Sequence, residues 1–98
     1  MLIFLCYKSK IKTFIVNLDR RPDRMKTFKK TCKEVDFLNW QRFSAIDGSL
    51  IHKENTSLLP GEIGVLMTHF EIIKKCYEEN LNNVLILEDD VSFTDQIN

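Results

Sequence analysis

Three adjacent carboxylates, Glu88, Asp89 and Asp90, directly follow an apolar run at residues 84–87. Neighbouring carboxylates repel one another, and a divalent cation relieves the repulsion because Mg²⁺ and Mn²⁺ prefer oxygen ligands. Side chains alternate along an extended chain, so we expect Glu88 and Asp90 to lie on the same side. Asp90 is the expected direct metal ligand, and Glu88 is a second ligand or orients a ribose hydroxyl or a metal-bound water. A cation held there would bridge the two phosphates of a nucleotide diphosphate.

The acidic run also has a simpler interpretation, as a solvated end of a strand where a loop begins. Four apolar residues change abruptly to three charged ones, and this change favours a functional site. The run alone does not decide between the two interpretations.

A second polar group, at residues 17–24, follows another apolar run. Asn17 and Asp19 could form hydrogen bonds to a base or a ribose, and Arg20 and Arg24 could bind phosphate through their guanidinium groups. Pro22 favours the first position of a helix, and a helix N-terminus attracts anions. The alternative is helix capping beside a solvated basic face, which we prefer for the lysines of this segment, Lys26, Lys29, Lys30 and Lys33.

The remaining reactive side chains give weaker signals. Asp47 and Gly48 form a turn signal near a position where a nucleoside could lie. His69 has no second histidine or nucleophile near it in a recognisable pattern, so we expect it to be packed or capping. The three cysteines, Cys6, Cys32 and Cys76, lack metal-ligand spacing and are expected to be free thiols.

Five elements would position these groups. Residues 12–18 and 83–87 are β-branched or apolar runs typical of buried strands, and residues 36–45 suggest a strand between them, the second in chain order. Residues 50–59 read as an exposed loop. Helical periodicity follows Pro22 and Pro60. The first helix has an apolar face of Met25, Phe28, Cys32 and Val35, and the second has a stripe of Ile63, Leu66, Met67, Phe70, Ile73, Tyr77 and Leu81.

The order strand, helix, strand, helix, strand predicts an α/β fold with a parallel sheet. Ligands of such open sheets bind beyond the carboxyl ends of the strands. The acidic run and the Asn17 segment both lie at such ends. This shared location is the first indication of a binding site.

Composition limits the classes of function. The 98 residues, 44% hydrophobic and with zero formal net charge, are expected to form one ordered domain without a global field for nucleic acid or anionic membranes. The apolar N-terminus is seven residues long, too short to span a bilayer and without the features of a signal peptide. We therefore expect no transmembrane segment and a cytoplasmic location.

Four segments together resemble glycosyltransferase family 25, the group of lipooligosaccharide and collagen galactosyltransferases. The similar segments are residues 14–24 (FIVNLDRRPDR), 43–48 (FSAIDG), 60–69 (PGEIGVLMTH) and 85–91 (LILEDDV). Each motif is modestly specific, and the four in this order make a strong set. Val65 and Thr68 replace the cysteine and serine usual in the third motif, which are mild changes.

The resemblance implies a Rossmann-like parallel sheet with flanking helices, the nucleotide-binding half of a GT-A-type fold. It implies transfer of a sugar from a nucleotide-sugar donor, with UDP-galactose or UDP-glucose expected, to a glycan or hydroxylysine acceptor. Glu88 and Asp90 would form the Mn²⁺ or Mg²⁺ motif, and Glu62 and His69 would lie on the helix behind the donor pocket. The implied donor-binding residues are Asn17, Asp19, Arg20, Arg24, Asp47, Gly48, Glu88 and Asp89.

The sequence ends eight residues after Asp90, so we expect residues 1–98 to be a single partial domain without the acceptor-binding half. Two alternatives remain open. A receiver-like phosphoacceptor domain fits poorly, because its acidic pair follows the first strand. A non-catalytic remnant that keeps the fold, and with it the nucleotide site, is the stronger competitor.

Overall fold

The computed structural model describes residues 2–3, 11–51 and 57–93. Three parallel strands form its centre, with β2 (Lys12–Asn17) between β3 (Gln41–Ser44) and β4 (Val84–Glu88). The register places Asn17 beside Ser44 and Val16 beside Glu88. Two short strands, β1 (Leu2–Ile3) and β5 (Ser92–Phe93), form a separate parallel pair. The parallel sheet confirms the predicted α/β, Rossmann-like class.

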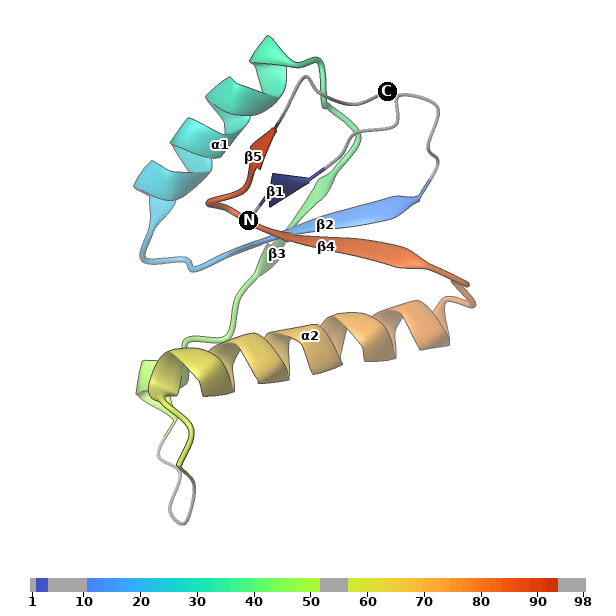
Figure 1. Ribbon diagram of the computed structural model, residues 1–98. Coiled ribbons are helices and arrows are strands. Elements are labelled where there is room, and N and C mark those ends of the chain that lie inside the picture. Colours follow the sequence, from blue (N-terminus) through green and yellow to red (C-terminus); the bar gives the residue numbers. More distant parts are fainter. Residues whose placement is uncertain (1, 4–10, 52–56, 94–98) are drawn as a thin grey trace.

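The two helices cover opposite faces of the three-stranded sheet (Figure 1). Alternation along β2 explains this arrangement, because consecutive side chains point to opposite faces. Ile15 packs with Met25, Phe28 and Cys32 of α1 (Pro22–Glu34). Its neighbour Phe14 packs with residues of α2 (Pro60–Glu78) on the other side, namely Ile72 and Cys76. Each helix is therefore held by its own apolar cluster.

The apolar face predicted for α1 is confirmed at Met25, Phe28 and Cys32, which are all buried. The helix begins at Pro22, as expected, and ends at Glu34. Burial raises the pKa of the Cys32 thiol to about 11, so this cysteine stays protonated and unreactive near neutral pH. Cys32 and Cys76 are free thiols, as predicted, and Cys6 lies outside the described residues.

The second predicted strand, residues 36–45, is wrong in its first half. Only Gln41–Ser44 form β3, because the preceding residues end α1 and cross to the sheet. Asp36 adopts a positive φ of 57°, and the Phe37 N–H donates to the Cys32 carbonyl at 2.9 Å. The Trp40 indole N–H donates to the Phe37 carbonyl at 3.1 Å. These bonds close the end of the helix and keep both rings against the α1 cluster.

The buried face predicted for α2 is largely wrong. The buried residues are Ile63, Gly64, Thr68, Ile72 and Cys76. Most of the predicted stripe is exposed instead: Leu66 at 61%, Phe70 at 65%, Ile73 at 57% and Tyr77 at 83%. The helix turns its small residues inward because Gly64 and Thr68 contact the segment that precedes the 3₁₀ turn η1 (Gly48–Leu50).

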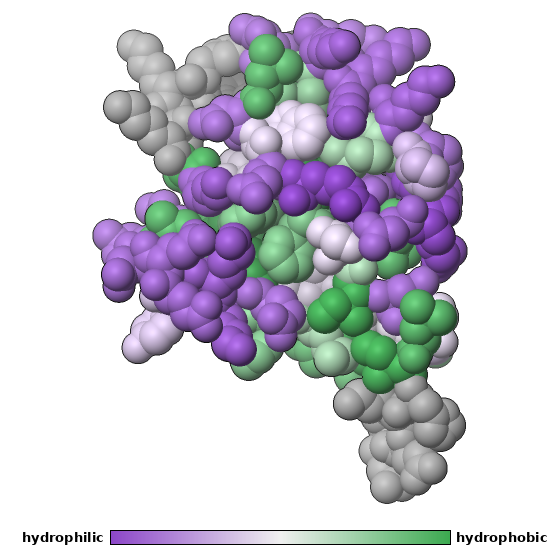
Figure 2. All heavy atoms as spheres, turned by 180° about the vertical axis from the view of Figure 1, so that it is seen from behind, coloured by the Kyte–Doolittle hydropathy of each residue, from purple (hydrophilic) through white to green (hydrophobic). Residues whose placement is uncertain are grey.

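Part of the predicted loop at residues 50–59 lies outside the described residues, since residues 52–56 are not described. Hydrophobic side chains gather where η1 and the start of α2 meet (Figure 2). The exposed leucines of that end are Leu50, Leu58 and Leu59. Among the described helices, none is both long and apolar enough to cross a membrane.

Candidate functional site

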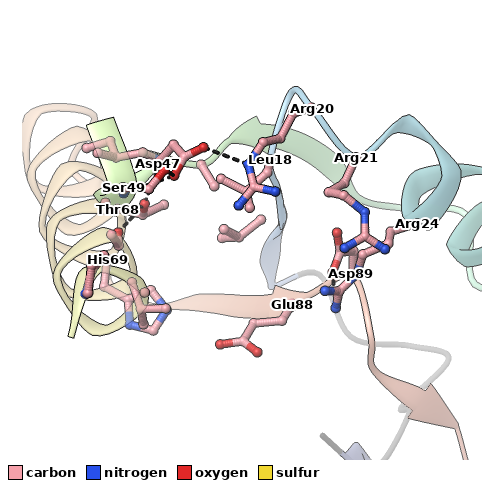
Figure 3. Close-up of a pocket in the computed structure, with 18 residues that line it drawn as sticks. Leu18, Arg20, Arg21, Arg24, Asp47, Ser49, Thr68, His69, Glu88 and Asp89 are labelled. Atoms are coloured by element: carbon pink, nitrogen blue, oxygen red, sulfur yellow. Dashed lines mark hydrogen bonds and ion pairs between the residues drawn. The ribbon is translucent and has the colours of Figure 1, made fainter. Parts of the chain in front are cut away.

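A pocket of about 230 Å³ opens beyond the carboxyl ends of β2 and β4 (Figure 3). Its walls come from the start of α1, the turn into η1, the start of α2 and the end of β4. The predicted site residues that line it are Arg20, Arg24, Asp47, Gly48, Glu88 and Asp89. Asn17, Asp19 and Asp90 do not line it. Residues from all four sequence motifs thus meet around one cavity, at the edge where parallel sheets bind ligands.

Asn17 and Asp89 form hydrogen bonds that hold one wall of the pocket in place. The Asn17 side-chain amide donates to Asp89 Oδ2 at 2.6 Å and to the Arg21 carbonyl at 3.1 Å. The other Asp89 oxygen lies 2.7 Å from Arg24 Nη2. Asn17 is buried, and only 8% of the Asp89 side chain is exposed. These two residues therefore fix the Arg24 guanidinium in the wall.

Arg42 completes this network and was missed by the sequence analysis. Its Nε donates to Asn17 Oδ1 at 3.0 Å, and its Nη2 donates to the Asn17 carbonyl at 3.1 Å and to Asp19 Oδ1 at 2.6 Å. Ser44 Oγ donates to the same Asp19 oxygen at 2.9 Å. The Arg42 and Ser44 hydrogen bonds lower the pKa of Asp19. Asp19 consequently joins the end of β2 to β3, outside the pocket.

The only available signal for Arg42 is strand alternation. Arg42 and Ser44 are two residues apart on β3, so their side chains share a face. The contact with Asn17 depends on the register between β2 and β3. Sequence alone does not give that register.

Asp47 is held by three hydrogen bonds at the rim of the pocket. Its Oδ1 accepts from the Ser49 backbone N–H at 3.0 Å and from Ser49 Oγ at 2.6 Å, and its Oδ2 accepts from Arg20 Nε at 2.7 Å. The Ser49 and Arg20 hydrogen bonds lower the pKa of Asp47 to about 2. Asp47 thus caps η1, and its ion pair holds the Arg20 guanidinium on the η1 side of the pocket (Figure 3).

Two glycines allow η1 and α2 to meet at the floor of the pocket. A Cβ on Gly48 would lie 1.6 Å from the Pro60 carbonyl oxygen, and one on Gly64 would lie 2.5 Å from the Ile46 carbonyl oxygen. Thr68 joins the same contact, because its hydroxyl accepts from the Ile46 N–H at 2.9 Å and donates to the Gly64 carbonyl at 2.6 Å. The glycine motifs therefore serve backbone-to-backbone packing.

Glu88 and Asp90 are separated by a turn, so strand geometry does not bring them together as ligands of one metal ion. The Val91 N–H donates to the Glu88 carbonyl at 3.1 Å, so the chain is no longer extended at residues 89–90. Strand alternation therefore does not place the two carboxylates on one side, contrary to the sequence argument. Glu88 lines the pocket, whereas Asp90 lies outside its lining and is 51% exposed, 3.7 Å from Arg24.

Within the described ranges, no group of three or more His, Cys, Asp or Glu side chains could hold a metal ion. Mg²⁺ and Mn²⁺ are commonly held by one or two carboxylates together with substrate phosphates and water. Glu88 fits that pattern, because it faces the cavity and has no ion-pair partner in the described part of the chain. A divalent cation is thus compatible with the site when phosphate supplies further ligands.

Glu62 and His69 both lie on α2, as the resemblance implied. Glu62 accepts a hydrogen bond from the Leu59 N–H at 2.9 Å and so caps the helix. His69 lines the pocket and is partly buried. The sequence analysis gave His69 a packing or capping role and did not foresee its place in the pocket wall.

Comparison with known proteins identifies the family. The family profile described as glycosyltransferase family 25 (LPS biosynthesis protein) matches residues 10–98, nearly the whole chain. The chain belongs to glycosyltransferase family 25. All four sequence motifs that carry the resemblance fall within the matched range.

Curated relatives of this family 25 chain cover the same region. A glycosyltransferase 25 family member of Drosophila pseudoobscura pseudoobscura is 31% identical over 98 residues, which are 82% of this chain and 16% of the relative. Procollagen galactosyltransferase 2 of Mus musculus is 30% identical over 101 residues, 85% of this chain and 16% of the relative. The chain therefore spans about a sixth of the length of the curated relatives it matches.

A third relative is named inactive. Inactive glycosyltransferase 25 family member 3 of Homo sapiens is 29% identical over 100 residues, 84% of this chain and 17% of the relative. Its identity to this family 25 chain is close to that of the galactosyltransferases. Identity at this level does not separate active from inactive members, so the geometry of the site must carry the functional argument.

Proposed function

We propose that this chain supplies the donor-binding part of a metal-dependent glycosyltransferase and takes a nucleotide-sugar donor into the pocket. One observation carries the proposal. Cationic side chains from the start of α1, the Asp47 rim and the Glu88 carboxylate face one cavity beyond the ends of parallel strands. Family membership supports the reaction class, and the lining of the cavity supports it as the proposed donor site.

The donor phosphates would lie against the wall formed by Arg21, Arg24 and the start of α1. Guanidinium groups bind phosphate through paired N–H donors. The start of α1 adds little to this, because Pro22 has no N–H and the Asp23 carboxylate accepts from the Asp23 and Arg24 N–H groups. The Asp89 contact at 2.7 Å holds Arg24 in place before a ligand arrives, which lowers the entropic cost of binding.

The divalent cation, Mn²⁺ or Mg²⁺, would be held by Glu88 and by phosphate oxygens, with Asp90 as the second predicted protein ligand. When bound, it would neutralise the diphosphate as the sugar leaves. Asp90 is exposed and lies beside the Arg24 wall, 3.7 Å from its guanidinium. Both ligand assignments remain predictions of this account.

The donor sugar and the acceptor are proposed from the relatives. Procollagen galactosyltransferase 2 carries galactose transfer in its name, and the profile description refers to LPS biosynthesis. UDP-galactose or UDP-glucose is accordingly the proposed donor, and a glycan or a protein the proposed acceptor. A GT-A-type arrangement, a role in lipooligosaccharide synthesis and a cytoplasmic location belong to the same proposal.

Calorimetry on the full 98-residue chain tests the proposal. UDP-galactose should bind in the presence of Mn²⁺ and lose at least tenfold in affinity when Mn²⁺ is removed. Glu88→Gln and Asp90→Ala should each weaken Mn²⁺-dependent binding by about 10- to 100-fold, as expected for loss of a metal ligand.

Lys74→Ala is the matched control, because Lys74 is exposed on α2 and does not line the pocket. It should bind like the unaltered chain. A chain that binds no nucleotide sugar with or without metal would support the non-catalytic remnant and contradict the proposal.

A further inference from the structure

Most charged side chains of the pocket already have protein partners. Arg20 is paired with Asp47 at 2.7 Å, Arg24 with Asp89 at 2.7 Å, and Arg21 with Asp23 at 3.0 Å. These ion pairs fix the side chains in the pocket walls, and they already occupy part of the hydrogen-bonding groups of each side chain.

Glu88 and His69 differ from these pairs. Both side chains are partly buried and line the cavity, and neither has a hydrogen bond or ion pair within the part of the chain that the structure describes. Partly buried polar groups normally find a partner, because desolvation without one is costly. Glu88 comes from the end of β4, whereas His69 comes from α2, away from the arginine wall (Figure 3). Glu88 is therefore available to the proposed cation, and His69 has hydrogen-bonding groups that a ligand in the cavity can use.

We propose that His69 binds hydroxyl groups of a sugar ring of the donor, in the cavity where Glu88 holds the proposed cation. This inference rests on the proposed function and adds a residue to it. A neutral imidazole both donates and accepts hydrogen bonds, so His69 matches sugar hydroxyls, which also donate and accept. The arginine wall matches phosphate instead, and the separation of the two groups orients the donor along the pocket.

The α2 packing explains how His69 is held towards the cavity. His69 directly follows Thr68, which is buried and bonded to both Ile46 and Gly64. These contacts fix the rotation of α2 against η1. His69 lines the pocket on α2 together with Val65, one helical turn before it.

The test compares UDP-galactose with UDP for the full chain and for His69→Ala and His69→Gln, in the presence of Mn²⁺. Two sources offer the same hydroxyl chemistry, the ribose and the transferred hexose. His69→Ala should weaken binding about fivefold, the equivalent of one net hydrogen bond. A loss for UDP-galactose alone assigns His69 to the hexose, and an equal loss for UDP assigns it to the ribose. His69→Gln keeps one donor and one acceptor and should recover part of the loss.

Glu71→Gln, an exposed change on the same helix, is the control and should bind like the unaltered chain. Unchanged affinity of His69→Ala for both ligands overturns this inference while leaving the proposed function standing. Absence of binding to the unaltered chain contradicts the proposed function and this inference together.

Discussion

At the scale of single residues, neighbouring carboxylates in the acidic motif have different surroundings. Asp89 is nearly buried and bonded to Asn17 and Arg24, whereas Asp90 is half exposed and has one long contact with Arg24. Glu88 faces the cavity without a partner in the described residues. The middle residue therefore maintains the wall, and the outer two are available to a cation or a ligand.

This difference predicts unequal effects of two adjacent substitutions on stability. Asp89→Ala should lower the free energy of unfolding by about 2 kcal/mol, because it leaves Asn17 and Arg24 without their partner. Asp90→Ala should change it by less than about 0.5 kcal/mol, as is typical of exposed charges. Urea unfolding followed by circular dichroism measures both. Equal effects of the two substitutions would contradict the separate roles.

Asp47 gives the fold a pH dependence with a defined sign. Its pKa is about 2 in the folded chain, below the value near 3.9 of a free aspartate. Its contribution to stability is therefore complete above about pH 4 and is lost as pH falls towards 2. Asp47→Asn removes this contribution, so its melting temperature should lie below that of the unaltered chain above pH 4. The difference should shrink between pH 4 and pH 2, and a constant difference across that range would count against the assignment.

At the scale of elements, α2 is positioned by its small residues. Gly64→Ala would push a Cβ to 2.5 Å from the Ile46 carbonyl oxygen and 2.9 Å from the Gly48 nitrogen. We expect a loss of about 2 kcal/mol in stability from overpacking, with weaker donor binding because η1 forms part of the pocket. Gly61→Ala is the matched control, since nothing lies within 4 Å of its added Cβ. It should be neutral or stabilise the chain by about 0.5 kcal/mol.

Chemical denaturation of both glycine variants gives the comparison. Two variants of similar stability would mean that the close approach of η1 and α2 does not constrain the fold.

The elements also show how much of the fold the sequence determines. The strands β2 and β4 and the helix α1 were predictable, because continuous apolar runs and a proline-initiated amphipathic pattern are strong local signals. The buried face of α2 was not, because Gly64 and Thr68 carry little hydrophobic signal and their burial depends on contact with η1. The first half of the second predicted strand was wrong. Apolar residues such as Phe37 and Trp40 can pack against the core from a loop, so their presence does not require a strand.

The location of the candidate site was predictable from the sequence, but the contacts of its individual residues were less so. Topology places the ends of β2 and β4 at one edge, which correctly brings Arg20, Arg24, Asp47 and Glu88 to one pocket. Asn17 and Asp19 do not line that pocket. The register between β2 and β3 places both beside Arg42, which donates hydrogen bonds to them. Such side-chain partners depend on neighbours far apart in sequence.

At the scale of the whole molecule, the chain combines a pocket at the ends of β2 and β4 with an exposed apolar helix surface. Leu66, Phe70, Ile73 and Tyr77 are all more than half exposed on α2. The chain spans about a sixth of the curated relatives it matches. The proposed donor binding involves described residues alone, because the pocket and its supporting network lie entirely within them.

The most direct test of the central claim is an NMR titration of the ¹⁵N-labelled full chain with UDP-galactose and Mg²⁺. Amide shifts should concentrate at residues that line the pocket, including Arg20, Arg24, Asp47 and Glu88, and should saturate with one equivalent of donor. The exposed face of α2 around Phe70 and Ile73 should remain unchanged. Absence of shifts, or shifts centred away from the pocket, would contradict the claim that this cavity binds a nucleotide-sugar donor.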